Sequence, residues 1–311
     1  MVNGKRIFIT GGAGYLGSNL IKRLHSTNEI TVYSRDEAKH YYLKKAYPNV
    51  NFIVGDVRNL DLMQRSSRSH DIGIFAASLK QIEACYDNYE EANKVIVEGA
   101  FNSRRVAEEN EFESACFISS DKSRAATTIY GAMKFVAGEA FIANASKSNV
   151  RLTTAIYGNV MGSTGSIIPL IWKSIENDAT LTLYGTEMTR FMLSITDAMD
   201  LIEKSLRYTG VNTVPMALSF RIEDMFELYR DLYGLKYTIA APRSGEKIHE
   251  IMISAEEVRR TTFRDGDDIY MIHPLNQPTQ VEDFPSGEYS SKDCVISKEQ
   301  LHCYLEKRDY K

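Results

Sequence analysis

Short apolar runs alternate with longer helical patterns through the first half of the chain, and this alternation constrains the fold more than any other feature. The apolar runs end at Thr10, Tyr33, Val54, Ala77 and Ser119, and a sixth covers residues 151–158. The helical patterns lie between them, at about 14–26, 36–46, 59–67, 84–110 and 129–146. Strands that alternate with helices predict right-handed crossovers and a parallel sheet covered on both faces. We therefore expect an α/β fold whose ligands bind at the carboxyl ends of the strands.

A glycine-rich turn directly follows the first apolar run and precedes an amphipathic helical pattern. Residues 11–17 read GGAGYLG, so glycines recur at the spacings G-x-G-x-x-G and G-x-x-G-x-x-G. Glycines let the backbone turn tightly against a pyrophosphate, which the N–H groups of the following helix N-terminus then bind. A tight turn without a ligand would use the same residues, but the place between strand and helix is the context that the motif requires. We expect a Rossmann-like, doubly wound sheet with a dinucleotide on Gly11, Ala13, Gly14, Tyr15, Leu16 and Gly17.

The end of the second run indicates which dinucleotide binds. Ser34 and Arg35 stand there, and Lys39 comes one helical turn later. These side chains suit the 2′-phosphate of NADP, whereas a site for NAD usually presents an acidic residue to the ribose hydroxyls. Asp36 is the alternative, since it either accepts from the ribose or caps the helix that starts there. We expect NADP rather than NAD. Further cofactor contacts are expected after the third run and near the end of the fourth, at Asp56, Val57 and Ala76.

The second half of the chain is less regular and predicts a smaller lobe. A glycine-rich stretch at 158–165 ends the regular alternation, and short apolar segments with helical patterns at about 196–207 and 221–233 follow. We predict an NADP-binding Rossmann domain at 1–165 and an α+β substrate-binding lobe at 166–311, with segments of about 190–220 returning to the Rossmann sheet.

Composition excludes several classes of function. The chain has 311 residues, 43% of them hydrophobic and 25% charged, as in ordinary globular proteins. Its net charge of −4 gives no overall positive field for nucleic acid or an anionic membrane. The four cysteines are scattered, the six histidines show no metal-ligand spacing, and no apolar stretch approaches 18 residues. We expect a cytoplasmic protein with free thiols, no bound metal, and no nucleic-acid or membrane partner.

Two pairs of residues around the fifth run predict proton chemistry. Tyr130 and Lys134 are four residues apart on one helical face, and a nearby ammonium lowers the pKa of a tyrosine so that it becomes a usable base. Asp121 and Lys122 follow the fifth run, where an acid and an amine lie above the expected cofactor. Tyr41 and Lys45 share the first pair's spacing but not its location, and we expect an ordinary exposed pair there.

With these motifs in place, the chain resembles the extended short-chain dehydrogenase/reductases that act on nucleotide sugars, and among them the inverting UDP-N-acetylglucosamine 4,6-dehydratases. The resemblance spans nearly the whole chain in order. The glycine turn and the Tyr130–Lys134 pair mark only the superfamily, whereas the Asp-Lys pair after the fifth run is more discriminating. The motifs that carry it are GGAGYLG at 11–17, YSRDE at 33–37, AASLK at 76–80, SDK at 120–122, YGAMK at 130–134, YGNV at 157–160, MTRF at 188–191, RSGEKIHE at 243–250 and YSS at 289–291.

The resemblance implies a mechanism with a tightly bound NADP that is regenerated in each turnover. Tyr130 would take the 4-hydroxyl proton while hydride passes from C4 to NADP⁺. Lys122, if its amine is neutral, would remove the C5 hydrogen, and protonated Asp121 would give a proton to the departing C6 hydroxyl. Hydride return to C6 and reprotonation of C5 on the opposite face would leave an inverted 4-keto-6-deoxy sugar.

The resemblance also implies contacts with the nucleotide-sugar substrate and a homo-oligomer, dimer or higher. Arginines suit the diphosphate and a carboxylate suits the ribose hydroxyls. The long helices at 84–110 and 129–146 would form a four-helix interface through Val95, Phe101 and Phe135, although these side chains equally suit an intramolecular core. The matching substrate positions are Lys80, Ser120, Asn159, Met188, Arg190, Arg243 and Glu246.

Departures from the family pattern lie around the substrate rather than the cofactor. Gln81 stands where the family usually has histidine, Ile96 replaces an asparagine, and Ala125-Ala126 replace a usual Asn-Pro. They leave open which acylamino sugar is bound and whether C5 is inverted. The alternatives are a non-inverting 4,6-dehydratase or a 4-epimerase on the same scaffold, and a non-catalytic NADP-sensing protein. The epimerase needs no acid for C6, and the sensor could dispense with Tyr130 and Lys134.

Overall fold

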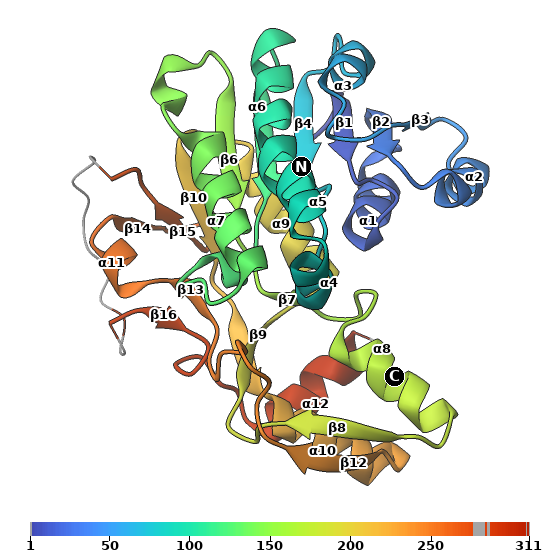
Figure 1. Ribbon diagram of the computed structural model, residues 1–311, viewed down its shortest axis with the longest axis vertical. Coiled ribbons are helices and arrows are strands. Elements are labelled where there is room, and N and C mark those ends of the chain that lie inside the picture. The colour runs from blue at the N-terminus through green and yellow to red at the C-terminus, as the bar shows by residue number, and fades with distance from the viewer. Residues whose placement is uncertain (1, 276–283, 285–286, 309, 311) are drawn as a thin grey trace.

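A large sheet flanked by helices and a smaller lobe make up the molecule (Figure 1). The computed structural model describes residues 2–275, 284, 287–308 and 310. The strands are β1 (Arg6–Thr10), β2 (Glu29–Ser34), β3 (Asn51–Val54), β4 (Ile72–Phe75), β5 (Ser114–Ile118), β6 (Arg151–Ala155), β7 (Asn159–Val160), β8 (Thr180–Tyr184), β9 (Thr189–Leu193), β10 (Val211–Pro215), β11 (Leu218–Arg221), β12 (Lys236–Ala240), β13 (Ile251–Ile253), β14 (Thr261–Arg264), β15 (Ile269–Ile272) and β16 (Tyr289–Ser290). The helices are α1 (Tyr15–Leu24), α2 (Glu37–Ala46), α3 (Leu60–Ser66), α4 (Ile82–Asp87), α5 (Tyr89–Asn93), α6 (Gly99–Glu109), α7 (Ile129–Ile142), α8 (Ile167–Glu176), α9 (Ile195–Ser205), α10 (Ile222–Tyr233), α11 (Ala255–Val258) and α12 (Lys298–Lys307).

The main sheet has nine strands in the order β14-β15-β10-β6-β5-β4-β1-β2-β3. The strands from β3 to β10 pair in parallel, and β15 and β14 add an antiparallel edge beside β10. The strand order reverses between β1 and β4, and such a switch point opens a crevice at the carboxyl ends of the strands. The predicted α/β, Rossmann-like doubly wound sheet is confirmed.

Alternate residues of the strands pack against helices on opposite faces of the sheet. Ile7 and Ile9 of β1 belong to a core with Leu20 of α1 and Ile202 of α9. Phe8, between them, belongs to a second core with side chains of α6 and α7, including Phe141. Because successive side chains of a strand point to opposite faces, an apolar run without polar alternation requires cover on both sides.

The smaller lobe contains a third core, built from α8, α10, α12 and the strands beside them. Strand β8 pairs in parallel with β12, and β9 pairs with both β7 and β11. In Figure 1 this lobe lies below the carboxyl ends of the main strands, with the chain's C-terminus near α8.

The segment predicted as one helix at 84–110 is interrupted. It ends as α4 at Asp87, restarts as α5 at Tyr89, and contains a π-helical turn over Lys94–Glu98 before α6. Asn88 separates the first two helices with a non-helical backbone, φ −132° and ψ 52°. Val95 lies in the second core, so its side chain serves the intramolecular alternative, whereas Phe101 and Phe135 are 52% and 40% exposed.

The part of the second half that returns to the main sheet differs from the expectation. Strand β10 lies within the predicted 190–220 region and pairs with β6, but β9 belongs to a separate sheet. Strands β14 and β15 also join the main sheet, which the sequence reading placed in the lobe. Strands β14 and β15 pair antiparallel and lie outside the strand–helix alternation, so the alternation could not predict that they pair beside β10. The boundary at residue 165 stays a prediction.

Candidate active site

A cleft of about 1290 Å³ runs along the carboxyl ends of β1 to β6 and continues between the sheet and the lobe. Residues that directly follow these strands line it, as the doubly wound topology requires. Every residue predicted to contact the cofactor borders this cleft. They are Gly11, Ala13, Gly14, Tyr15, Leu16, Gly17, Ser34, Arg35, Lys39, Asp56, Val57, Ala76, Tyr130 and Lys134.

The glycine turn has the geometry of a dinucleotide cradle. Gly11 has φ +68°, and a Cβ on it would lie 2.8 Å from the Ala77 nitrogen. A Cβ on Gly17 would lie 2.3 Å from the Cα of Gly12. The N-cap of α1 is Gly14, which has no side chain to accept from the first-turn N–H groups. Those donors border the cleft and fit the pyrophosphate of a dinucleotide.

The cations predicted to bind a 2′-phosphate are already paired with carboxylates. Lys39 Nζ lies 2.7 Å from Asp36 Oδ2, and Arg35 Nη1 lies 3.7 Å from Asp56 and 3.6 Å from Glu91. Asp36 caps α2 by accepting from the Lys39 backbone, which is the alternative role foreseen for it. The Arg35 and Lys39 side chains are more than half exposed, so a bound phosphate can replace these carboxylates at little cost.

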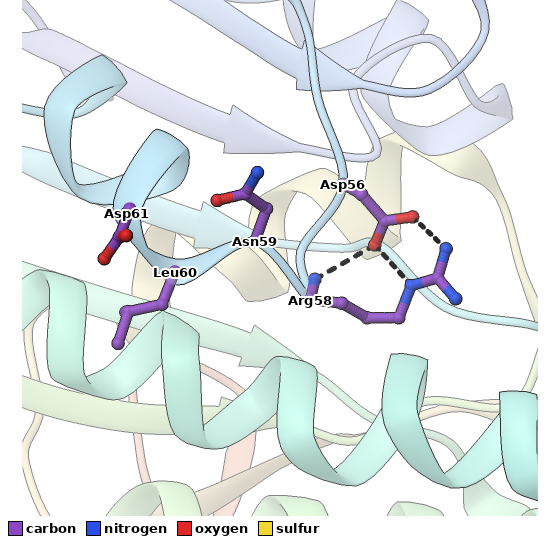
Figure 2. A pocket seen from close by; sticks show the side chains of 5 residues that line it. All are labelled: Asp56, Arg58, Asn59, Leu60 and Asp61. Atoms are coloured by element: carbon purple, nitrogen blue, oxygen red, sulfur yellow. Dashed lines mark hydrogen bonds and ion pairs between the residues drawn. The ribbon is translucent and has the colours of Figure 1, made fainter.

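A second, more open pocket adjoins this end of the cleft (Figure 2). Asp56 accepts from the Arg58 backbone at 2.9 Å and from its guanidinium at 2.5–2.9 Å. Asn59 caps α3 by accepting from the Leu62 backbone. Asp56 and Arg58 are thus engaged in an ion pair and Asn59 in a helix cap, and we assign the pocket no ligand. Sequence reasoning missed Arg58 and Glu91, because the sequence gives no sign that a charge on the loop after β3 pairs with one on α5.

Tyr130 and Lys134 both face the cleft from α7, near the carboxyl end of β5. Thr128 caps α7 by accepting from the Gly131 backbone at 3.1 Å. A Cβ on Gly131 would lie 2.2 Å from the Lys122 carbonyl oxygen, so this glycine lets the helix start against the turn that carries Lys122. Tyr41 and Lys45, by contrast, form the exposed pair expected of them, with Lys45 Nζ 4.2 Å from the Tyr41 ring.

The electrostatics of Tyr130 differ from the expectation. Burial raises the pKa of Tyr130 to about 12, and the opposing influence comes from the Lys122 charge and the Ser120 hydroxyl rather than from Lys134. Lys134 instead donates to the Ile118 carbonyl at 2.8 Å, and burial lowers its pKa to about 7. Lys134 is therefore not among the charges that act on Tyr130 in this structure, since an amine buried without a carboxylate partner loses its charge readily.

Asp121 and Lys122 lie in a 3₁₀ turn after β5, and two further side chains surround the amine. Lys122 Nζ is 3.2 Å from Asp121 Oδ1, 3.3 Å from Asn159 Oδ1 and 3.3 Å from Glu250 Oε1. Burial opposes the Lys122 charge, but the carboxylates of Asp121 and Glu250 outweigh it and raise the pKa of the amine above its usual value. The neutral amine that the mechanism needs is thus not the resting form. Burial also raises the pKa of Asp121, whose Oδ2 has no hydrogen-bond partner.

Five of the seven predicted substrate residues line the cleft, and two lie beneath it. The five are Lys80, Ser120, Asn159, Arg243 and Glu246. Met188 is 1% exposed, and the Arg190 guanidinium donates to the carbonyls of Thr189, Lys247 and Ile248. Both side chains are buried, and neither Met188 nor Arg190 lines the cleft.

Residues from both sides meet across the substrate end of the cleft. Lys80 donates to the Thr164 carbonyl, and Arg243 lies 3.5 Å from Glu83 and 4.2 Å above the Tyr184 ring. Sequence reasoning missed Glu83 and Thr164. Glu83 follows Gln81, where the chain departs from the family pattern, and Thr164 lies outside the motifs that carry the resemblance. Sequence reasoning also missed the role of Glu250, although the motif that contains this residue was recognised.

Metal-ligand clusters, disulfides and membrane-spanning helices were also sought among the described residues. No group of three or more His, Cys, Asp or Glu side chains that could hold a metal occurs among the described residues. All four cysteines, which lie within that part, are free. Within the same residues no helix is both long and apolar enough to cross a membrane.

Comparisons with known proteins agree with this geometry. The family model described as polysaccharide biosynthesis protein matches residues 7–274. A UDP-N-acetylglucosamine 4,6-dehydratase (inverting) from Campylobacter jejuni is 32% identical over 285 residues, covering 88% of this chain and 84% of that protein. A UDP-glucose 4-epimerase from Rickettsia bellii is also 32% identical, covering 96% of this chain and 95% of that protein.

Solved structures share the fold. Pen from Bacillus thuringiensis superposes with a TM-score of 0.90 at 24% identity, covering 99% of both chains. DesIV, a dTDP-glucose 4,6-dehydratase from Streptomyces venezuelae solved with NAD bound, superposes with a TM-score of 0.68 at 19% identity, covering 78% of this chain and 86% of that one.

Proposed function

This chain belongs to the polysaccharide biosynthesis protein family within the extended short-chain dehydrogenase/reductases, and from that premise we propose that it is an inverting UDP-N-acetylglucosamine 4,6-dehydratase. The observation that carries the proposal is the buried Asp121 at the carboxyl end of β5, 3.2 Å from Lys122, which lines the same cleft as Tyr130. Elimination of water from C5 and C6 needs both a base and an acid, and this pair supplies them.

The cofactor we propose is NADP, bound on the glycine turn with its adenosine toward Arg35 and Lys39. Two exposed cations at the end of β2 support this preference, although NAD is the cofactor in DesIV. When bound, the nicotinamide supplies the oxidation at C4 by accepting hydride and the reduction at C6 by returning it. Lys134, buried with a lowered pKa, would orient the nicotinamide ribose through its amine.

Tyr130 would accept the proton of the sugar's 4-hydroxyl. Its raised pKa makes the phenolate a strong proton acceptor, while the nearby Lys122 charge and Ser120 hydroxyl stabilise that phenolate once it forms. Its burial excludes bulk water from the reacting oxygen.

Asp121 and Lys122 would exchange one proton to reach the reactive state. Transfer from Lys122 Nζ to Asp121 Oδ1, which are 3.2 Å apart, breaks an N–H bond and forms an O–H bond without changing the pair's total charge. The neutral amine then takes the C5 proton, and the carboxylic acid gives its proton to the departing C6 hydroxyl. The pair ends as the ion pair seen in the structure, so elimination needs no proton from outside.

The substrate would lie between the sheet and the lobe. Arg243 suits the diphosphate, Glu246 suits the uridine ribose, and Lys80, Ser120 and Asn159 would contact the sugar. Arg190 is reassigned below, because it does not line the cleft. We further propose a homo-oligomer that covers the exposed Phe101 and Phe135, and a cytoplasmic location, which the four free cysteines support.

The decisive test is incubation with UDP-N-acetylglucosamine and NMR of the product. We expect a 4-keto-6-deoxy sugar with inverted C5. A 4-keto-6-deoxy sugar with retained C5 would indicate a non-inverting dehydratase. A product that is only the C4 epimer would favour the epimerase, which the Rickettsia bellii relative makes the second candidate. Unchanged sugar would contradict both.

A further inference from the structure

Glu250 is a buried carboxylate next to Lys122, and Lys122 lines the cleft. Its side chain is 5% exposed, and Oε1 lies 3.3 Å from Lys122 Nζ and 3.7 Å from Arg190 Nε. The other oxygen, Oε2, has no hydrogen-bond partner. A buried charge without full compensation destabilises a fold, and such groups gather where chemistry needs them.

The position of Glu250 is fixed from both sides. Its backbone N–H donates to Ser291 Oγ at 2.9 Å, and its carbonyl accepts from the Ser291 backbone at 2.8 Å. Strand β13 begins at the next residue and pairs with β16. The carboxylate is therefore held by rigid backbone while its tip reaches the catalytic turn.

The Lys122 amine has three oxygen neighbours, from Asp121, Asn159 and Glu250, at 3.2–3.3 Å. An ammonium has three N–H donors, so this set matches its protonated form. Of these three residues only Asn159 lines the cleft, whereas Asp121 and Glu250 are buried behind Lys122. Asp121 already serves as the acid in the proposed elimination, so Glu250 is the carboxylate of the set that remains to act on the amine.

The charges around this cluster come from four elements. Asp121 and Lys122 lie on the 3₁₀ turn, Tyr130 on α7, Arg190 on β9, and Glu250 and Lys247 on the segment before β13. Lys247 Nζ is engaged with the Arg124 carbonyl. Lys122, Arg190 and Lys247 together keep the pKa of Glu250 below its usual value despite burial, so it faces Lys122 as a carboxylate.

We propose that Glu250 is a positioning residue for the catalytic base: its carboxylate holds the Lys122 amine at the cleft floor and strengthens it as a proton acceptor, while Arg190 keeps Glu250 ionised. This inference rests on the proposed dehydratase function. When the neutral Lys122 takes the C5 proton, an ammonium forms 3.3 Å from a fixed carboxylate, which stabilises the charge that develops in that step. Arg190 lies 3.7 Å from Glu250 and 3.7 Å from Glu246, so its charge acts on these two carboxylates.

The test compares Glu250→Gln with wild type by two measurements. The first is the titration midpoint of Lys122, followed by NMR of [ζ-¹⁵N]lysine-labelled protein with the signal assigned through Lys122→Met. The second is the pH dependence of deuterium exchange at C5 of UDP-N-acetylglucosamine. We expect the Lys122 midpoint to fall by about one pH unit or more in Glu250→Gln and the limiting exchange rate to fall about tenfold.

Glu257→Gln is the matched control, since Glu257 is another buried glutamate with arginine partners but no contact with Lys122. It is expected to lower thermal stability without moving the Lys122 midpoint. Glu250→Asp keeps the negative charge but places it farther from the Lys122 amine, so its Lys122 midpoint should lie between those of Glu250→Gln and wild type. This variant replaces Glu250→Gln in the test if the Gln variant does not fold.

The outcomes separate the two proposals. An unchanged Lys122 midpoint in both Glu250 variants overturns the role of Glu250, whatever the substrate is. Absence of C5 exchange in wild type overturns the dehydratase function, while the midpoint shift, which needs no turnover, still decides the inference.

Discussion

The two ends of the cleft hold ion pairs of opposite character. At the adenosine end, Arg35 and Lys39 have side chains 55% and 62% exposed, and their carboxylate partners are also within reach of water. At the reaction end, Asp121, Arg190 and Glu250 are almost fully buried. Exposed pairs contribute about 0–1 kcal/mol and can be exchanged for a ligand's charge. Replacing a buried ion pair by a ligand's charge costs much more free energy, so the buried carboxylates and cations instead set the pKa values of their neighbours.

The largest effect is expected from the reaction end, in Lys122→Ala. Removal of the base should slow deuterium exchange at C5 by about 10²–10⁴-fold, because that is the usual contribution of a positioned acid or base. Cofactor binding, measured by calorimetry, should stay unchanged since the glycine turn lies elsewhere in the cleft. Rapid deuterium uptake by the variant would remove Lys122 as the base.

Lys134→Met probes a buried amine of the same cleft and gives a stability effect with a defined sign. Burial lowers the Lys134 pKa from 10.5 to about 7, so between these values the unfolded chain binds more protons than the folded one. The contribution of Lys134 to the free energy of unfolding therefore rises with pH between about 7 and 10.5 and is constant below that range. From pH 7 to pH 9 wild type should gain about 2–3 kcal/mol relative to Lys134→Met, which lacks the titrating group.

Urea unfolding of both proteins at pH 6, 7, 8 and 9 measures this difference. The C4 oxidation should be lost in the same variant if Lys134 orients the nicotinamide ribose. If the free energy of unfolding depends on pH in the same way in both proteins, Lys134 is charged in the folded state. Its ammonium would then be stabilised by more than the contact with the Ile118 carbonyl.

The sequence predicted the cofactor end better than the reaction end, and the reason is physical. Strand ends and glycine turns are local, so GGAGYLG between a strand and a helix located the cradle, and Arg35 and Lys39 followed from the end of β2. The charge environment of Lys122 depends on Glu250, which is 128 residues away in the chain and meets Lys122 through the packing of β13 against the catalytic turn.

The same limit explains the errors in the fold. The alternation of apolar runs predicted the parallel strands, because a strand that is buried on both faces is visible in the sequence as a continuous apolar run. It gave no sign that β14 and β15 would extend the main sheet, since edge pairing depends on a partner that periodicity does not specify. Arg190 was predicted from its motif to contact the substrate, and only the fold shows that its Nη1 donates to three backbone carbonyls.

At the adenosine end, Arg35→Ala should have a moderate effect that depends on the cofactor. NADP affinity is expected to fall about tenfold, as for loss of one charge-assisted contact to phosphate, while NAD affinity stays nearly constant. Calorimetric titration with each cofactor measures both constants, and Arg105→Ala, an exposed arginine paired with Glu109, is the matched control. An equal loss for both cofactors would show that Arg35 does not contact a 2′-phosphate.

The smallest effect is expected from Glu91→Gln, which tests whether the exposed ion pairs at the adenosine end can be exchanged for a ligand's charge. Glu91 lies 3.6 Å from Arg35 and 2.6 Å from Arg58, so its charge competes with a phosphate for Arg35. Its removal should tighten NADP binding about two- to threefold, because the competing pair is exposed and screened. The gain should shrink at high salt and vanish in the Arg35→Ala background. A gain that persists without Arg35 would place the effect on Arg58, whose guanidinium is held by Asp56 at the open pocket of Figure 2.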